Sequence, residues 1–168
     1  WQGEGFVLLV HPAMRFTRHW DIGLLHALRL CRPDAEKRAV LTGFLPTPDD
    51  PVDAVSPVAA EGFDEGGCLC FHPGTPLRYA RQPELSAFLH PAFCFAPAAF
   101  FQDMAGAEAP LFLAAFEREW MLFTLHKPLI HLAWGCPIAP CPIPEGTGSA
   151  EALARFGMKF SMKLPERK

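Results

Sequence analysis

Four polar side chains that can bind ligands follow an apolar run near the start of the sequence. The run GFVLLV ends at Val10, and the next residues, HPAMRFTRHWD, bring His11, Arg15, His19 and Asp21 close together in the chain. An imidazole can ligate a metal or carry a proton, and a guanidinium binds phosphate or carboxylate groups. If the run is a buried strand, these side chains lie at its carboxyl end, where α/β proteins commonly bind ligands. The stretch predicts a ligand site, with a solvated loop as the alternative.

Two glutamates are candidates for catalytic carboxylates. The segment Pro110 to Leu125, PLFLAAFEREWMLFTL, predicts one long helix that begins at its proline. Helical spacing puts Glu119 on a stripe of aromatic side chains, where an unpaired carboxylate is costly to bury. The stripe consists of Phe112, Phe116 and Phe123. Glu117 lies about 200° around the helix from Glu119, so the two cannot share one face. The alternative is an exposed Glu117–Arg118 pair beside a Glu119 that a backbone donor or a buried arginine satisfies.

Histidine, cysteine and aspartate side chains offer further candidate ligands. His131 lies in the apolar segment PLIHLAW, where it is either a metal ligand or a satisfied core residue. Four of the six cysteines form two closely spaced pairs, Cys68 with Cys70 and Cys136 with Cys141. Neither spacing is the C-x2-C of common zinc sites, so we expect reduced structural cysteines, with a zinc site as the alternative. The acidic segment Thr47 to Gly67 is either a surface loop or a cation-binding loop.

The order of the apolar segments predicts a single α/β domain over residues 1–168. We expect strands at GFVLLV, RAVLTGFLP, CLCF, FCFA and PLIHLAW. We expect helices from Asp21 to Leu30, after Pro97, over the segment that contains the two glutamates, and at AEALARF after Ser149. A strand, a helix and a second strand in succession imply a crossover within one sheet. Residues 159–168 are expected to form a loose tail.

The composition excludes several classes of protein. Half of the 168 residues are apolar and fifteen are Phe, so the chain is neither disordered nor fibrous. The net charge of −3 and the absence of a basic tract argue against a nucleic-acid partner. Charged residues interrupt the longest apolar stretch, so we expect no membrane span. With no recognisable signal peptide, we expect a soluble, cytoplasmic protein.

A pattern of short motifs runs through most of the chain. Gly3-Glu4 and FVLLV precede HPAMRF, and Trp20-Asp21 follows after three residues. Later come Val40-Leu41-Thr42, then FCFAPAAFF, and finally GTGSAEALARFGMKF. In these segments the sequence resembles the GlcNAc-transferase-like glycosyltransferases. These are relatives of the enzymes that add N-acetylglucosamine to hydroxyproline in a ubiquitin-ligase adaptor subunit.

The resemblance implies a GT-A-type fold, with a mixed sheet flanked by helices and without the N-terminal strands that bind the nucleotide. It also implies transfer of a GlcNAc-like sugar from a nucleotide-sugar donor to a protein or glycan hydroxyl. A divalent cation, Mn²⁺ or Mg²⁺, would bridge the donor diphosphate and neutralise charge on the leaving nucleotide.

The resemblance also implies roles for particular residues. Arg15 would contact a phosphate or a structural carboxylate. Asp21 would cap the following helix and orient its neighbours at the donor site, which Thr42 would also support. His11 and His131 would hold the metal, and Glu119, with Glu117 second, would be the acceptor-side carboxylate. This account predicts that His11, Arg15 and Glu119 converge on one crevice.

One departure from the family pattern affects the metal site. The aspartate and the histidine of the family's metal motif are replaced here by His11 and Ala13. Because an imidazole suits a hard cation less well than a carboxylate does, the alternative is a non-catalytic binding or scaffold module with a degenerate metal site.

Overall fold

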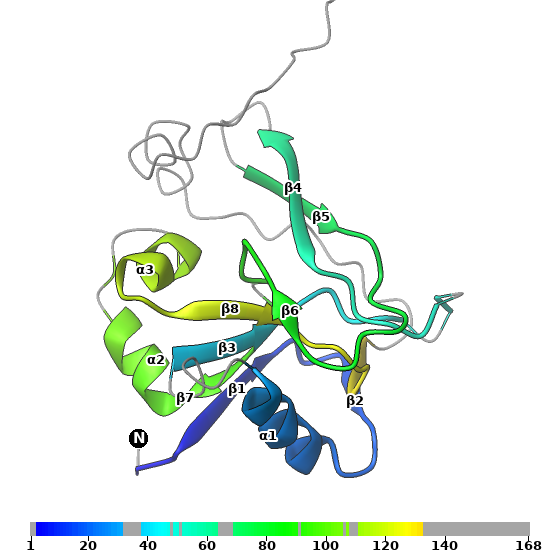
Figure 1. Ribbon diagram of the computed structural model, residues 1–168, viewed down its shortest axis with the longest axis horizontal. Helices are drawn as coiled ribbons and strands as arrows, with labels where there is room; N and C mark the ends of the chain where they lie inside the picture. The colour runs from blue at the N-terminus through cyan, green and yellow to red at the C-terminus, as the bar shows by residue number, and fades with distance from the viewer. Residues whose placement is uncertain are drawn as a thin grey trace, which may run out of the picture.

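A five-stranded mixed sheet forms the centre of the protein, with strand order β1-β7-β3-β8-β6 (Figure 1). The structure is a computed structural model that describes residues 3–31, 38–47, 49–50, 52–63, 69–90, 92–105, 107 and 111–132. The strands of this sheet are β1 (Phe6–Val10), β7 (Phe93–Pro97), β3 (Ala39–Thr42), β8 (Met121–Thr124) and β6 (Glu84–Leu85).

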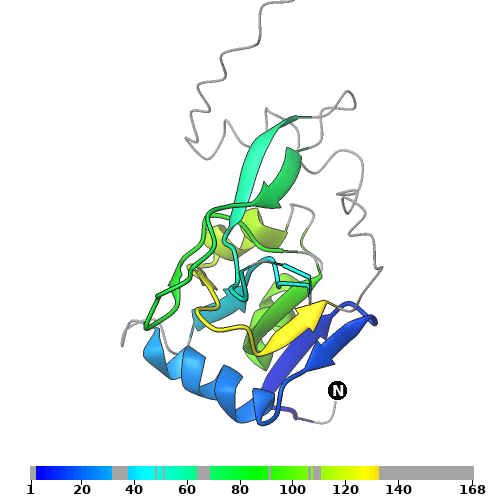
Figure 2. The same cartoon turned by 90° about the vertical axis from the view of Figure 1, so that its right-hand side faces the viewer.

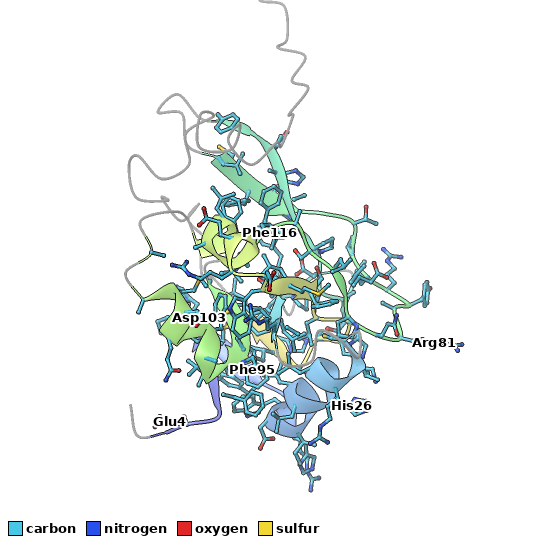
Figure 3. The ribbon with its side chains drawn as sticks, turned by 60° about the vertical axis from the view of Figure 1, so that its left-hand side comes forward. Glu4, His26, Arg81, Phe95, Asp103 and Phe116 are labelled. Atoms are coloured by element: carbon cyan, nitrogen blue, oxygen red, sulfur yellow. The ribbon has the colours of Figure 1, made fainter. Side chains whose placement is uncertain are left out.

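Helices cover both faces of the sheet. Helix α1 (Trp20–Leu30) packs on one face, while α2 (Ala98–Met104) and α3 (Leu111–Glu117) pack on the other. The two helical layers lie on different sides of the strands in Figure 1. Figure 3 shows side chains filling the space between the layers, while His26 on α1 and Arg81 point outward. The predicted α/β class, with a mixed sheet flanked by helices, is confirmed.

The central strands are buried on both faces because their apolar side chains alternate. In β3, Ala39 and Leu41 join the core under α1, whereas Val40 joins the core under α2 and α3. In β8, Phe123 and Leu122 divide between the two cores in the same way. Successive side chains of a strand point to opposite faces, so a continuous apolar run suits a sheet covered on both sides.

Three strands of the central sheet have their carboxyl ends on the same side of the sheet. β3 and β8 are parallel, and β1 and β3 both run antiparallel to β7. β1, β3 and β8 therefore point the same way. The expected crossover from β1 through α1 to β3 is present, but β7 lies between the two strands.

Two small sheets extend from this body. β2 (Met14–Phe16) pairs with β9 (Ile130–Leu132), and β4 (Val58–Phe63) pairs with β5 (Leu69–Pro73). The β4–β5 hairpin projects away from the central sheet in both views (Figures 1 and 2). Because β4 falls within the segment expected to be a loop, that expectation is wrong over six residues.

The long helix predicted from Pro110 to Leu125 is wrong in its second half. α3 ends at Glu117, and Glu119 then adopts a left-handed backbone conformation with φ 60°. The chain continues as β8, between β3 and β6. Burial of Leu122 and Phe123 in the sheet overrides the helical spacing, since tertiary packing decides such ambiguous apolar runs. Glu119 consequently lies on no aromatic stripe, and its side chain is 86% exposed.

The first strand also differs from its expected environment. β1 was expected to be a buried strand, but it is an edge strand that pairs antiparallel with β7 and is partly exposed. The expected helix after Ser149, the tail 159–168 and Cys68, Cys136 and Cys141 lie outside the described residues. Within the described residues, no helix is long and apolar enough to cross a membrane.

Candidate functional site

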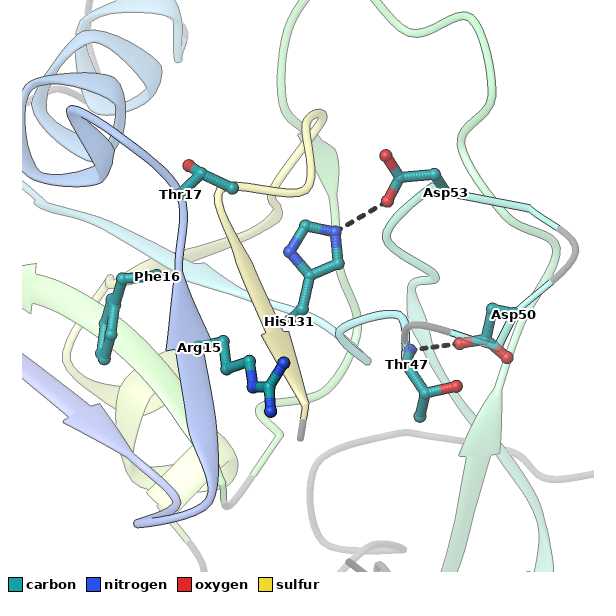
Figure 4. A pocket seen from close by; sticks show the side chains of 7 residues that line it. All are labelled: Arg15, Phe16, Thr17, Thr47, Asp50, Asp53 and His131. Atoms are coloured by element: carbon teal, nitrogen blue, oxygen red, sulfur yellow. Dashed lines mark hydrogen bonds and ion pairs between the residues drawn. The ribbon is translucent and has the colours of Figure 1, made fainter. Parts of the chain in front are cut away.

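A cavity of about 330 Å³ lies beyond the carboxyl ends of β1, β3 and β8 (Figure 4). Its lining comes from the segments that follow those three strands: Arg15, Phe16 and Thr17 after β1, Thr47, Asp50 and Asp53 after β3, and His131 after β8. Ligands of α/β proteins commonly bind outside the carboxyl ends of the strands. We call this cavity the Arg15 pocket.

Pairing of β2 with β9 places the two nitrogen-rich side chains side by side. Arg15 and His131 are direct partners in the antiparallel register. Because cross-strand partners project from the same face, both side chains point to one side of the ladder, and Figure 4 shows Phe16 directed away from them. The Thr17 main-chain N–H and hydroxyl both donate to the Leu129 carbonyl, at 3.0 and 2.9 Å, and extend the ladder.

The Arg15 guanidinium is available for a ligand. Its side chain is exposed at the cavity, and it makes no hydrogen bond or ion pair with any part of the chain that the structure describes. A guanidinium presents a planar fork of donors that matches the oxygens of phosphate and carboxylate groups. Arg15 can therefore bind an oxyanion without breaking an interaction with any of the described residues.

Two aspartates form the opposite wall of the cavity. His131 Nε2 lies 2.8 Å from Asp53 Oδ1, and Asp50 accepts a hydrogen bond from the Thr47 main-chain N–H (Figure 4). These contacts fix the segment after β3 beside β9. The Leu132 main-chain N–H adds a further bond to the Pro46 carbonyl at 3.0 Å.

The charge around the cavity is mixed. Two carboxylates face one guanidinium, so an anion as highly charged as a diphosphate meets repulsion as well as attraction. A divalent cation would relieve this repulsion. No group of three or more His, Cys, Asp or Glu side chains suited to a metal occurs among the described residues. His131 and Asp53 therefore fit only a cation that takes most of its ligands from phosphates and water, as Mg²⁺ commonly does.

The two predicted metal ligands do not meet in this cavity. His11 is not among the lining residues. Its Nδ1 accepts a hydrogen bond from the Ala13 main-chain N–H at 3.2 Å, and its own main-chain N–H donates to the Ala92 carbonyl at 3.1 Å. Of the predicted pair, the structure places His131 alone at the cavity.

Thr42 occupies a structural position in the core. It is fully buried, and its hydroxyl donates to the Phe93 carbonyl at 3.1 Å and accepts from the His90 main-chain N–H at 2.7 Å. These bonds join β3 to the start of β7, and Thr42 does not line the Arg15 pocket. His90 beside it is also buried, and burial lowers the pKa of its imidazole to about 4.

Asp21 and His19 belong to the start of α1. The helix begins at Trp20, so Asp21 lies in its first turn, where a carboxylate suits the positive end of the helix dipole. The N-cap residue is His19, which has φ 61° and makes no side-chain capping bond. Neither residue lines the Arg15 pocket. Asp21 therefore stabilises the first turn of α1, but the expectation that it caps the helix is wrong.

Glu117 and Glu119 line a different cavity, of about 350 Å³, together with Arg38, Asp103 and Arg118. Arg38 directly precedes β3, and Glu119 comes two residues before β8, so this cavity lies at the amino ends of those strands. Arg38 Nη1 lies 3.6 Å from Glu119 Oε2. The predicted convergence of Arg15 and Glu119 on one crevice is therefore wrong.

Asp50, Asp53, Thr17 and Thr47 were missed as individual site residues. The acidic composition of the segment after β3 was the available signal, and it singled out no residue because six carboxylates are spread along that segment. Which of them reaches His131 depends on the pairing of β2 with β9, a contact between segments more than a hundred residues apart.

Comparison with known proteins adds no assignment. No protein-family model matches the chain, and no curated protein matches its sequence.

Proposed function

We propose that this chain is a glycosyltransferase-like domain that binds the diphosphate of a nucleotide-sugar donor in the Arg15 pocket. The observation that carries the proposal is the convergence of segments from the carboxyl ends of β1, β3 and β8 on one guanidinium that lacks a partner among the described residues. The resemblance of the HPAMRF and Trp20-Asp21 motifs to glycosyltransferases supplies the ligand class.

Different residues of the pocket would contact different parts of the nucleotide sugar and its cation. Arg15 donates to phosphate oxygens, and a bidentate contact would also fix their orientation. Asp53 and His131 would hold a divalent cation that arrives with the nucleotide. When bound, that cation neutralises charge that develops on the leaving diphosphate. Thr47 offers a hydroxyl group at the cavity wall for the sugar or the phosphates, whereas the Thr17 hydroxyl, which already donates to the Leu129 carbonyl, can only accept from a sugar hydroxyl.

A transfer reaction also needs a group that accepts the proton of the attacking hydroxyl. Asp50 and Asp53 are the carboxylates that line the Arg15 pocket. Glu117 and Glu119 lie in the other cavity and do not reach this donor site. We therefore propose Asp50 as the base in place of the glutamates, because Asp53 is assigned to the cation and a general base must lie within hydrogen-bond reach of the proton.

The separation of Glu119 from Arg15 favours a second candidate function. A domain that binds a nucleotide sugar without transferring it needs only the phosphate contacts, and the two cavities lie at opposite ends of the parallel strands. Such a non-catalytic binding module would retain donor affinity and lack turnover.

Calorimetry combined with an activity assay tests both candidates on the full chain. We expect UDP-GlcNAc to bind in the presence of Mn²⁺, and Arg15→Gln to weaken that binding at least tenfold. Release of UDP at a rate above the uncatalysed one supports transfer or hydrolysis, whereas binding without UDP release supports the binding module. Failure of UDP-GlcNAc, UDP and other nucleotide sugars to bind would overturn the proposal.

A further inference from the structure

The outer edge of β1 presents main-chain hydrogen-bonding groups that point away from the sheet. β1 is the first strand in the order β1-β7-β3-β8-β6 (Figure 1). The Gly5 carbonyl accepts from Ala98, and the His11 N–H donates to Ala92, so these two residues face β7. Because the facing direction alternates along an antiparallel strand, the intervening residues Phe6, Leu8 and Val10 direct their N–H and carbonyl groups outward. Within the described residues, nothing pairs with them.

This edge lacks the features that usually prevent strands from associating. Phe6–Val10, with the sequence FVLLV, contains no charge and no proline, and its pairing with β7 runs without a bulge. The side chains of Phe6 and Leu9 are 47% and 43% exposed. Natural edge strands are commonly very short, charged or bulged, whereas an uncharged apolar edge of ordinary length, such as this five-residue strand, can accept another strand. By contrast β6, at the other edge, is two residues long and carries Glu84.

The strand is complementary to itself. If two copies meet antiparallel about Leu8, then Leu8 lies opposite Leu8, and Phe6 lies opposite Val10. All three outward-facing residues then fall on hydrogen-bonded pairs, which gives about six main-chain hydrogen bonds across a two-fold axis. Apolar side chains meet on both faces of the new ladder. No charge lies within the paired segments, so two copies meet without like-charge repulsion there.

We propose that β1 is a homodimerisation edge, at which a second copy of this chain adds its own β1 and extends the sheet through both molecules. The occupant is an extended strand because the unpaired groups are those of a backbone. An interface of one strand pair is small, so the dimer forms at high protein concentration and dissociates on dilution. The Arg15 pocket lies beyond the ends of the strands, and the proposal does not depend on its ligand.

Hydrogen exchange on the unmodified full chain gives the most specific test. In dilute protein, we expect fast exchange at the amides of Phe6, Leu8 and Val10 and slow exchange at Val7 and Leu9, which bond to β7. Raising the protein concentration should slow exchange at the amides of Phe6, Leu8 and Val10 alone. Sedimentation velocity should show a shift from monomer to dimer over the same concentrations. A monomer at every concentration would overturn the proposal. Slow exchange of the Leu8 amide in the monomer would also overturn it, because another segment would then occupy the edge.

A pair of matched variants identifies the surface. Leu9→Lys places a cation diagonally opposite its copy across the two-fold axis and should raise the dimer dissociation constant at least tenfold. Leu85→Lys changes a leucine on β6 that is 54% exposed and should leave the constant unchanged. Circular dichroism confirms that each variant is folded. Equal dimerisation of the two variants would locate the interface elsewhere and contradict the proposal.

Discussion

Arg15 is the residue on which the proposed ligand binding chiefly depends. Its position follows from the register of β2 against β9, which sets it opposite His131. A charged hydrogen bond contributes about 1.5–3 kcal/mol, which corresponds to a change of roughly 10- to 150-fold in affinity.

We predict that Arg15→Gln lowers the affinity for UDP-GlcNAc and Mn²⁺ by about that factor, because the glutamine keeps polarity without charge. Arg81→Gln is the control, since Arg81 is exposed and lines neither cavity (Figure 3). Titration calorimetry measures both variants. Equal affinities would show that the nucleotide does not contact Arg15.

Glu119 does not line the Arg15 pocket, but its backbone adopts an unusual conformation in the turn between α3 and β8. A residue other than glycine pays about 1–2 kcal/mol to adopt the left-handed conformation that Glu119 holds. Its exposed ion pair with Arg38 offsets little of that cost.

We predict that Glu119→Gly raises the free energy of unfolding by about 1 kcal/mol. Glu117→Gly, at the last helical residue of α3, should lower it instead, because glycine is entropically unfavourable in a helix. Urea denaturation compares the two variants, and a destabilised Glu119→Gly variant would contradict this reading of the turn.

At the scale of elements, two buried histidines make stability depend on pH. His90 follows β6 and contacts β3, and its Nδ1 accepts a hydrogen bond from the Ala92 N–H at 3.1 Å. Protonation of Nδ1 would break that bond. Burial lowers the pKa of His90 to about 4, so the unfolded chain binds a proton more readily than the folded chain between roughly pH 6.5 and pH 4. His126 contributes with the same sign, because burial, then Lys127 and His26, lowers its pKa.

We predict that the protein loses stability as the pH falls through this window. His90→Asn keeps an acceptor for the Ala92 N–H without the titration, so it should reduce the loss by on the order of 2 kcal/mol. His72→Asn, at a site near the surface, is the control. Urea denaturation at a series of pH values supplies the measurement, and an unchanged slope in His90→Asn would contradict the assignment.

Elements whose local pattern agrees with their packing could be predicted from the sequence. The helix after His19, the β3 strand and the strand-to-helix turn at Pro97 were expected from apolar spacing and from turn and capping residues, and the structure confirms them. The segment EREWMLFTL could not be predicted correctly, because its apolar residues fit a helix and a strand equally well. The segment from Met121 to Thr124 forms strand β8 because it pairs with β3 on one side and with β6 on the other, and the local sequence does not show these pairings.

The candidate site was predictable only in part, for the same reason. Arg15 and His131 stood out as polar groups beside apolar runs, and the structure brings them together. Their aspartate partners come from a loop, and the glutamates were assigned to a helix face that does not exist. Pairing between strands that are far apart in the sequence determines where the aspartates and the glutamates lie. The spacing of residues within one segment cannot predict such pairing.

Over the whole molecule, the parallel strands β3 and β8 separate two polar cavities. The Arg15 pocket lies beyond their carboxyl ends, and the cavity lined by Arg38 and Glu119 lies at their amino ends. We propose that the nucleotide sugar and its cation bind in the first cavity alone.

We predict that Mn²⁺ binds the protein weakly by itself and tightly once UDP-GlcNAc is present. His131 and Asp53 supply too few ligands for a cation alone, since the described residues gather no group of three. Calorimetric titration of Mn²⁺ with and without the nucleotide sugar measures the difference. Asp53→Asn should abolish the enhancement, while Asp103→Asn, in the other cavity, should preserve it.

Paramagnetic line broadening tests the location of the site most directly. In an amide-resolved NMR spectrum, Mn²⁺ added with UDP-GlcNAc should broaden the signals of Arg15, Thr47, Asp53 and His131 and leave those of Arg38 and Glu119 sharp. Broadening centred on Arg38 and Glu119, or no selective broadening at all, would contradict the account.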